Sequence, residues 1–318
     1  MEELASEINP ELNNQYFPKP LPFIEKNGFS HAFMAIFWVI IAFIGFNLVG
    51  AIVGLVLAFA TAPDITNTQA VLESIASNID LLLWANTSGQ VLVMLLGTLL
   101  ILKMSATKGK RKEFLRLKTS KNVWQVTALA VVLTITLYPT VIFLGWLNSF
   151  VPAPDFMVEM QESMMEVITK FLNSENALVL GILHIGMVPA ICEEVMYRGY
   201  IQRSFEKNWG IWAAIIVSGF IFGAYHLQIN NILPLSFLGI MFAYLTYISD
   251  SLIPAMVAHF VNNGGQVIAS SFYPAMLEQT ITPETEIPWN LIVFSIIISS
   301  ALVYLLHRLK PTPKHEFI

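Results

Sequence analysis

The sequence has little charge and almost no cysteine. Only 12% of its 318 residues are Asp, Glu, Lys or Arg, about half the share in a typical soluble domain. The single cysteine, Cys192, excludes a disulfide bond within the chain. Residues 1–30 are polar and lack the apolar core of a signal peptide, so none is expected. The composition therefore argues against an ordinary soluble domain and against a disulfide-stabilised one.

Apolar residues are what the sequence has in abundance: they make up 55% of it, and the mean hydropathy is +0.64. They form runs that could cross a bilayer as helices, each of which needs about 20 predominantly apolar residues. The predicted spans cover 31–60, 89–102, 123–150, 177–203, 210–226, 233–248, 254–272 and 289–306. The predicted fold class is therefore all-α, a polytopic membrane bundle of about eight transmembrane helices.

The segments between the spans predict two further helices. In the polar segment 61–86, Leu72, Ile75 and Ile79 recur at helical spacing, which indicates a short helix on the membrane surface. Residues 151–175 are acidic and repeat apolar side chains in the same way, which predicts an amphipathic helix. This helix either lies on the membrane surface or packs on the bundle as a lid. Pro139 predicts a kink in the third span.

Positive charge is concentrated in a few loops. Eight of the 17 Lys and Arg residues lie between 103 and 121, and such loops are typically cytoplasmic. With eight spans, both termini are then expected in the cytoplasm. The predicted divisions are a cytoplasmic polar arm (1–30), N-terminal membrane helices with the basic loop and the surface helix (31–175), a core (176–272), and a last span with a basic tail (273–318). Nothing in the sequence indicates a nucleic-acid partner.

Three ionisable residues interrupt the fourth span. Each such group in hydrocarbon costs about 2.5–3.5 kcal/mol on insertion scales. We therefore expect Glu193, Glu194 and Arg198 to face the bundle interior or a wet cavity. Glu194 and Arg198 are four residues apart, on one helix face, and can pair. One arginine cannot balance both carboxylates. The side chain of Glu193 points about 100° away from that of Glu194 around the helix axis, so it remains available for chemistry.

Two later spans contribute His226, with Phe222 one turn before it, and His259, with Asn263 one turn after it. A helix rises about 1.5 Å per residue. If the fourth helix ends near Arg203, Glu193 lies about 15 Å from that end. His259 lies about 13 Å, and His226 about 24 Å, from the corresponding ends of their helices. These side chains can meet in mid-membrane if the fifth helix is tilted or begins later.

A carboxylate, two imidazoles and an amide in one cavity could hydrolyse a peptide bond. A carboxyl group in apolar surroundings has a raised pKa, which suits a general base that deprotonates water. An imidazole can hold that water, and Asn263 with a second imidazole can donate to the oxyanion. Glu193, His226 and His259 could instead ligate Zn²⁺ with one position open for water. The His-Glu-x-x-His signature is absent, and the sequence leaves the zinc-dependent and metal-free alternatives open.

Three motifs follow one another along the chain: Glu193-Glu194-x-x-x-Arg198, Phe222-x-x-x-His226 and His259-x-x-x-Asn263. Their order resembles that of the motifs in the CAAX-protease and bacteriocin-processing family of intramembrane proteases (CPBP, or Abi), and in particular the type 2 CAAX prenyl protease. The resemblance covers about residues 178–272. It implies an intramembrane endopeptidase built as a helical bundle, with a cavity reached from the cytoplasm.

The resemblance also implies a role for each residue. Glu193 would be the general base and His226 its partner in water activation, while His259 and Asn263 would form the oxyanion site. Glu194, Arg198 and Phe222 would support this geometry. The family leaves the metal question open, so no cofactor is expected with certainty and Zn²⁺ remains an alternative.

The implied substrate is a membrane-associated peptide or a lipidated, prenylated protein, with membrane lipids around the bundle. The expected location is a bacterial inner membrane. Two other functions remain open, a proton-coupled transporter and a non-catalytic membrane immunity or scaffold protein. Transporters often contain inverted repeats, and we find no such symmetry in this sequence, whose intramembrane polar residues gather in one half.

Overall fold

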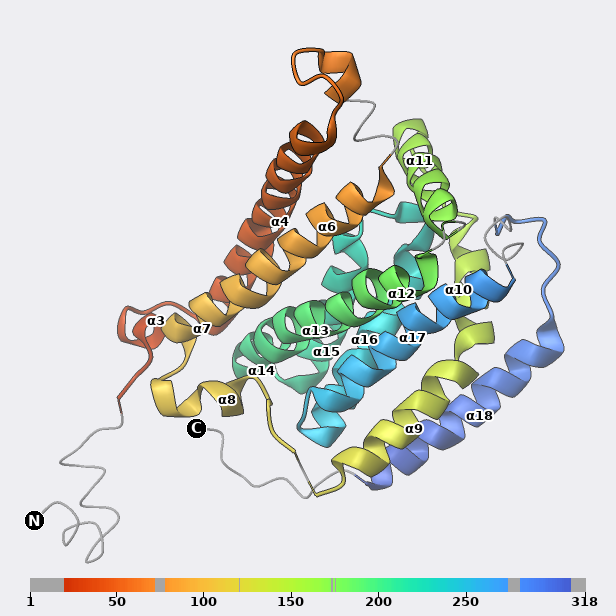
Figure 1. The fold of residues 1–318 in the computed structure, drawn as a ribbon. Coiled ribbons are helices and arrows are strands. Elements are labelled where there is room, and N and C mark those ends of the chain that lie inside the picture. Colours follow the sequence, from red (N-terminus) through yellow and green to blue (C-terminus); the bar gives the residue numbers. More distant parts are fainter. Residues whose placement is uncertain are drawn as a thin grey trace, which may run out of the picture.

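The computed structural model describes residues 20–71, 78–119, 121–172, 174, 176–273 and 281–309, and these residues form helices and loops without a strand (Figure 1). The predicted all-α membrane bundle is confirmed. The first half contains α3 (Phe23–Lys26), α4 (His31–Thr61), α6 (Ile79–Gly89), η1 (Gln90–Gly97), α7 (Thr98–Ser105), η2 (Lys108–Lys110), α8 (Arg111–Phe114), α9 (Val123–Thr136) and α10 (Tyr138–Asn148). The second half contains α11 (Asp155–Leu172), α12 (Ala177–Gly181), η3 (Ile182–Met187), α13 (Val188–Glu194), η4 (Val195–Gln202), α14 (Arg203–Trp209), α15 (Ile211–Tyr225), η5 (Ile229–Asn231), α16 (Ile232–Ser249), α17 (Ile253–Phe272) and α18 (Trp289–Arg308).

Within the described ranges, five helical rods are long and apolar enough to cross a bilayer, or six if the bent pair α9 and α10 counts as one span. The five are His31–Thr61, Ile79–Ser105, Ala177–Trp209, Ile229–Ser249 and Trp289–Arg308. These helices make the chain an integral membrane protein. The predicted count of eight is not confirmed, because α15 has only 15 residues and polar side chains lower the hydropathy of α17.

The second span is longer than predicted. It runs without a break from Ile79 to Ser105 through α6, η1 and α7, so Ile79 opens a spanning helix and not a surface helix. Leu72 and Ile75 lie outside the described residues. Polar residues in α6 conceal this span in a hydropathy reading, but several of them serve contacts within the bundle. Thr87, for example, hydrogen-bonds to Nδ1 of the buried His184 at 2.6 Å.

The kink predicted at Pro139 is confirmed as a bend of 47° between α9 and α10. Proline has no N–H to donate within a helix, so nearby carbonyl groups need other donors. One comes from α18, which lies beside α9 in Figure 1. Ser295 Oγ donates to the carbonyl oxygen of Thr136 at 2.6 Å and lies 2.7 Å from Thr140 Oγ1. The bend and the packing of the last span are therefore coupled.

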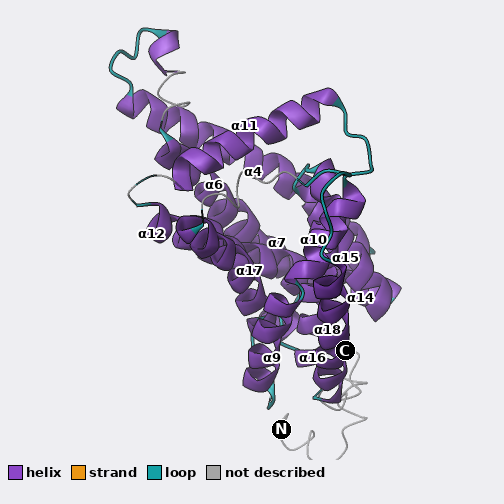
Figure 2. Ribbon diagram, turned by 90° about the vertical axis from the view of Figure 1, so that its right-hand side faces the viewer, coloured by secondary structure: helices purple, strands orange, loops and turns teal. Residues whose placement is uncertain are grey.

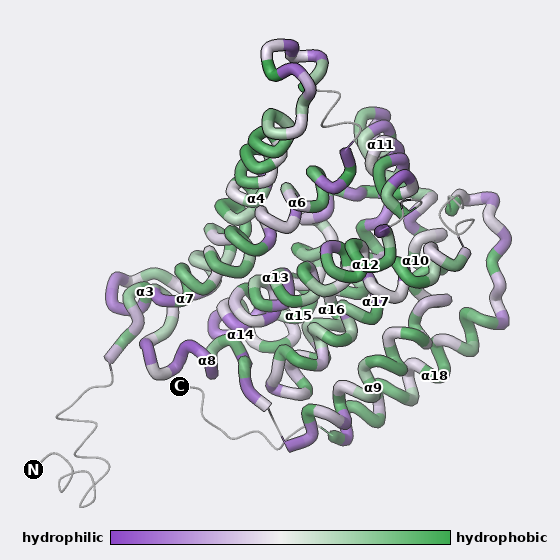
Figure 3. Tube along the Cα trace, in the orientation of Figure 1, coloured by the Kyte–Doolittle hydropathy of each residue, from purple (hydrophilic) through white to green (hydrophobic). Residues whose placement is uncertain are grey.

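The amphipathic helix predicted over 151–175 is α11, which lies across one end of the bundle (Figure 2). Hydrophilic and hydrophobic residues alternate along it, whereas α4 is hydrophobic along most of its length (Figure 3). Of the two predicted alternatives, the structure shows contact with the bundle. Phe171 is buried and packs near Gly181 and Val267. This contact holds the C-terminal end of α11 against α12 and α17.

Four charged side chains, which we call the charged rim, join three loops or helix ends at one end of the bundle. Arg116 of the basic loop donates two hydrogen bonds to Glu206 of α14, at 2.9 and 3.0 Å. Its Nε donates to Asp250, between α16 and α17, at 3.0 Å, and Lys118 also pairs with Asp250 at 2.6 Å. Arg116 and Glu206 are each 4% exposed. The loop 103–119, the end of α14 and the turn at Asp250 therefore lie at the same end of the bundle.

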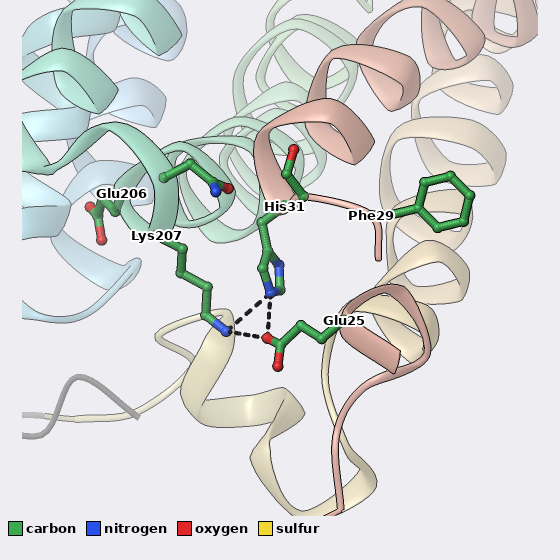
Figure 4. Close-up of a pocket in the computed structure, with 7 residues that line it drawn as sticks. Glu25, Phe29, His31, Glu206 and Lys207 are labelled. Atoms are coloured by element: carbon green, nitrogen blue, oxygen red, sulfur yellow. Dashed lines mark hydrogen bonds and ion pairs between the residues drawn. The ribbon is translucent and has the colours of Figure 1, made fainter. Parts of the chain in front are cut away.

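A second group of contacts ties the start of α4 to the end of α14. Glu25 accepts from Lys207 at 3.3 Å and lies 2.7 Å from His31 Nε2, as Figure 4 shows. The backbone N–H of Ala32 donates to the side chain of Asn208 at 2.9 Å. A pocket of about 440 Å³ opens beside these residues. It lies at the helix end and not at the predicted catalytic residues.

Asp250 of the charged rim is expected to make stability pH-dependent. Burial alone would raise the pKa of its carboxyl, but the hydrogen bond from Lys118 and the charge of Arg116 outweigh burial and hold the pKa below its usual 3.8. The folded state therefore favours the ionised form, so this contribution is present above pH 3.8 and is lost as the pH falls through the folded-state pKa.

Thermal melting in detergent between about pH 3 and pH 6 tests this expectation. The wild-type Tm should fall on acidification, and Asp250→Asn, which is already less stable at the higher pH, should fall less steeply. A gap in Tm between the two proteins that is the same at both ends of this range would contradict the expectation.

Candidate active site

The helix that carries the two glutamates is one rod from Ala177 to Trp209. Two π-helical stretches, η3 and η4, lie on either side of α13, which ends with Glu193 and Glu194. Such π turns occur frequently at functional sites. They rotate the following turn of helix, and therefore decide which side chains face the bundle interior.

The expectation that this helix ends near Arg203 is wrong, because it continues to Trp209. Counted from Trp209, Glu193 lies 16 residues, or about 24 Å, from the helix end. His226 lies the same 16 residues from Gly210, the N-cap of α15. Glu193 and His226 therefore lie at the same distance from the turn that joins α14 and α15. The tilt or later start of the fifth helix that the sequence alone required is not needed.

Glu194 and Arg198 form the predicted ion pair, and both side chains are fully buried. Arg198 Nη1 donates to Glu194 Oε1 at 3.0 Å, and Nη2 donates to the carbonyl oxygen of Gly239 in α16 at 3.0 Å. The guanidinium carbon also lies 4.4 Å from the ring centre of Phe222 and 5.3 Å from that of Phe242. A desolvated cation gains from such aromatic faces. Glu194 is therefore neutralised within its own helix.

His259 of α17 connects the two glutamates. Its Nδ1 lies 2.8 Å from Glu194 Oε1 and donates to this carboxylate, while its ring stacks on Phe242 at 5.0 Å. Its Nε2 lies 4.0 Å from Glu193 Oε2 and 3.3 Å from Asn263 Nδ2. With Arg198 positive and Glu194 negative, one further proton on either His259 or Glu193 makes this group of four electrically neutral. The geometry thus suits the exchange of one proton between an imidazole and a carboxylate.

Glu193 is buried but poorly paired. Its Oε1 accepts one long hydrogen bond, from Gln90 Nε2 at 3.4 Å. Its Oε2 is buried and has no hydrogen-bond partner. A charged group without full pairing is costly inside a protein, and this is more typical of a functional residue than of a structural one. The two adjacent glutamates each have an unpartnered Oε2. They differ at Oε1, because Glu194 Oε1 is bonded to Arg198 and His259 whereas Glu193 Oε1 accepts only the long bond from Gln90.

Asn263 lies one turn beyond His259 on the same face of α17, as its spacing predicted. Its amide nitrogen donates to the carbonyl oxygen of Ile185 in η3 at 3.1 Å and lies 3.3 Å from His259 Nε2. Asn262 donates to Asn263 Oδ1 at 3.0 Å, which fixes the orientation of the amide. Asn263 is partly exposed. One of its N–H groups can therefore turn from the imidazole to a substrate oxygen.

His226 follows the last residue of α15 and is half-buried. Its Nδ1 donates to the carbonyl oxygen of Phe222 at 2.8 Å, which leaves Nε2 as an acceptor. The Phe222 ring lies 4.9 Å from the His226 ring and 5.7 Å from the His259 ring. The structure records no hydrogen bond between His226 and Glu193. It brings Glu193, His259 and Asn263 together, and Phe222 contacts the rings of both His226 and His259.

The residues of the alternative zinc site do not fit a metal ion in this geometry. Among the residues that the structure describes, no three His, Cys, Asp or Glu side chains converge as ligands. Glu193 and His259 approach to 4.0 Å, while the Phe222 ring contacts the rings of both His226 and His259. We therefore derive no step through a metal.

Three residues near Glu193 were missed by the sequence reasoning. Gln90 donates to Glu193 from the N-terminal half. Tyr197 and Tyr225 interact with the charge of Glu193, and their buried hydroxyl groups have no hydrogen-bond partner. Tyrosine and glutamine within apolar segments were the available signal. Neither residue type is charged, however, and nothing in the sequence pairs position 90 with position 193.

Comparison with known families now adds to this geometry. Residues 175–265 match the family described as type II CAAX prenyl endopeptidase Rce1-like. This segment is similar to the Rce1-like family. The resemblance suggested by the three motifs is thereby confirmed, and the match contains Glu193, His226, His259 and Asn263. Comparisons with curated proteins and with solved structures gave no match.

The Rce1-like segment ends before α18 and begins after α11. The family description is that of an endopeptidase, and the segment similar to it is the one that carries Glu193 and His259. Residues outside the match, among them Gln90 and the charged rim residue Arg116, still contact it directly. The N-terminal half is therefore part of the same packed bundle.

Proposed function

We propose that this protein is an intramembrane endopeptidase that hydrolyses a peptide bond with a water molecule activated by Glu193. One observation carries the proposal. Of two adjacent buried glutamates, Glu194 is neutralised by an ion pair with Arg198 and a hydrogen bond from His259. Glu193 pairs with no arginine or lysine, accepts one long hydrogen bond from Gln90, and lies 4.0 Å from the imidazole of His259. The Rce1-like match over the same residues supports the reaction class.

In the proposed reaction, Glu193 takes a proton from water, and the resulting hydroxide attacks the carbonyl carbon of the scissile bond. The carbonyl oxygen becomes an oxyanion that accepts a hydrogen bond from Asn263 Nδ2, which turns from His259. Glu193 then gives its proton to the leaving amine, and the C–N bond breaks. The products are a carboxylic acid and an amine.

The two histidines have different parts in this proposal. His259 holds its Nδ1 on Glu194, so its Nε2 faces the site and can share the proton with Glu193. His226 presents an unprotonated Nε2 because its Nδ1 donates to Phe222. That nitrogen can accept a hydrogen bond from a backbone N–H group of the substrate. Phe222 fixes the spacing of the two rings through its contacts with both.

The proposed substrate is a membrane-associated peptide, prenylated or otherwise hydrophobic. The support is that the site lies about 24 Å from the helix end, within a bundle whose outer surface is largely apolar. We further propose that the charged rim faces the cytoplasm, because the basic loop reaches the rim through Arg116.

Cleavage by the purified chain tests the proposed function. In detergent, the wild type should cleave members of a fluorogenic peptide library made with and without a prenyl group. His226→Ala should lower kcat by about 10²-fold, the cost of losing a group that orients the substrate. Lys170→Ala, at an exposed position on α11, serves as the unaffected control. Elemental analysis of the same samples reports zinc directly.

A wild type that cleaves no peptide in this library would count against the endopeptidase proposal. His226→Ala at the wild-type rate would remove His226 from the site while leaving Glu193 in place.

A further inference from the structure

The N-terminal half places one side chain directly against Glu193. Gln90 opens η1 within the span Ile79–Ser105, and the residue is 5% exposed. Its Nε2 donates to Glu193 Oε1 at 3.4 Å. Gln90 lies outside the Rce1-like segment, which begins at residue 175. A side chain from another part of the chain therefore touches the residue that the proposed reaction depends on.

The same pair of side chains presents two unpaired acceptors. Gln90 Oε1 and Glu193 Oε2 are both buried and have no hydrogen-bond partner. Buried polar atoms are nearly always hydrogen-bonded, so each unpaired one needs an explanation. Two acceptors on side chains that are already hydrogen-bonded to each other suit a small donor with two hydrogens. Water is such a donor, and a substrate N–H group provides only one.

We infer that Gln90 is a positioning residue for the hydrolytic water, an inference that rests on the proposed function. Its N–H holds Glu193, and its Oε1 accepts one hydrogen of the water while Glu193 Oε2 accepts the other. With both hydrogens accepted, the lone pairs of the water point away from the two side chains and toward the substrate. Glu193 then removes the proton that it already binds. Gln90 itself gains and loses no proton.

The geometry separates this role from simple packing. The amide nitrogen of Gln90 is bonded to Glu193, the residue that the proposed reaction depends on. Gln202 of η4 is a suitable comparison, since it is also buried and its Oε1 likewise has no hydrogen-bond partner, but its Nε2 donates to Glu206 and to the carbonyl oxygen of Ala243. These contacts lie toward the charged rim, away from Glu193. The two glutamines therefore make a matched pair for substitution.

Two substitutions at Gln90 test the inference in the full-length chain. Gln90→Met keeps the shape and removes the polar atoms, so kcat should fall by about ten- to a hundredfold while KM stays within about twofold. Gln90→Glu keeps one acceptor but places two carboxylates together. Its activity should be low at neutral pH and recover as the pH falls, because a shared proton restores the donor. Gln202→Met should lower the Tm and leave the pH profile of kcat as in the wild type.

Several outcomes would overturn the inference. One is a wild-type kcat in Gln90→Met, and another is a wild-type pH profile in Gln90→Glu. A loss of kcat in Gln90→Met that is matched in Gln202→Met and follows the loss of Tm would assign Gln90 to packing alone.

A contact measurement distinguishes failure of this inference from failure of the proposed function. In a Cys192→Ser background, Gln90→Cys combined with Glu193→Cys should be bridged by dibromobimane, which becomes fluorescent when it joins two nearby thiols. Leu92→Cys with Glu193→Cys is the control, because Leu92 is 50% exposed on the outer surface. Bridging in this variant, together with a wild-type chain that cleaves no peptide, would count against the proposed function and leave the placement of Gln90 intact. Bridging no better than in the control would refute the placement of Gln90, whatever the activity.

Discussion

Glu193→Gln is expected to abolish peptide cleavage while the protein stays folded. The substitution keeps the size of the side chain and removes the base that takes a proton from water. Loss of a general base lowers rates by about 10²–10⁴-fold, and here the same group also returns the proton to the leaving amine. We therefore expect kcat to fall at least about 10³-fold.

The fold should tolerate this change because Glu193 makes only one hydrogen bond, a long one from Gln90 at 3.4 Å. The new amide oxygen can still accept that bond. The measurement is kcat on a cleaved peptide together with the Tm and the elution volume in detergent. Glu193→Gln with more than about a tenth of wild-type kcat would contradict the proposed role of Glu193.

Glu194→Gln is the matched control at the neighbouring position. It weakens the ion pair with Arg198 and the hydrogen bond from His259, both of which are fully buried. We therefore expect the opposite pattern, a clear loss of Tm. If the two variants instead lost activity and Tm to the same degree, the distinction between a catalytic and a structural glutamate would be wrong.

Arg198→Met is expected to have the largest effect on stability. The side chain is fully buried, pairs with Glu194, and donates to the carbonyl oxygen of Gly239. Removing it leaves an unpaired buried carboxylate, and breaking one partner of a buried pair costs about 3–5 kcal/mol. Thermal melting and the yield of monodisperse protein in detergent measure the effect. A Tm equal to that of the wild type would refute this account of the pair.

Arg203→Met provides the comparison for Arg198→Met. Arg203 is 29% exposed, and its partner Glu206 keeps its two hydrogen bonds from Arg116. Its loss should therefore change the Tm little. Adding Glu194→Gln to Arg198→Met removes the unpaired charge and should recover part of the lost Tm. Failure of this double variant to recover any Tm would point to the Gly239 contact or to ring packing as the main contribution.

Local sequence patterns predicted the parts of the site that lie within one helix. The spacing of Glu194 and Arg198, and that of His259 and Asn263, placed each pair on one helical face, and hydrogen bonds join both pairs. A single turn of helix fixes such contacts, whatever the rest of the chain does. The apolar runs likewise predicted the all-α membrane bundle, although they hid the polar first half of the second span.

Contacts between helices could not be predicted in this way. Nothing near Glu194 in the sequence indicates that His259, 65 positions away, bonds to Glu194 and only approaches Glu193. Nor does any motif connect Gln90 with Glu193, which are 103 positions apart. These pairings depend on how the helices rotate about their axes, and the π turns on either side of α13 change that rotation.

The sequence by itself determined that the chain forms a helical membrane bundle, that charged residues lie within it, and which residues belong to the three Rce1-like motifs. Composition and spacing are sufficient for this, because the cost of unpaired polar groups in lipid permits few alternatives. Only the tertiary structure decided which residues from other helices reach the two carboxylates. His259 of α17 bonds to Glu194 and only approaches Glu193, and Gln90 of η1 bonds to Glu193. These contacts depend on how α17 and η1 pack around one helix, which local spacing does not determine.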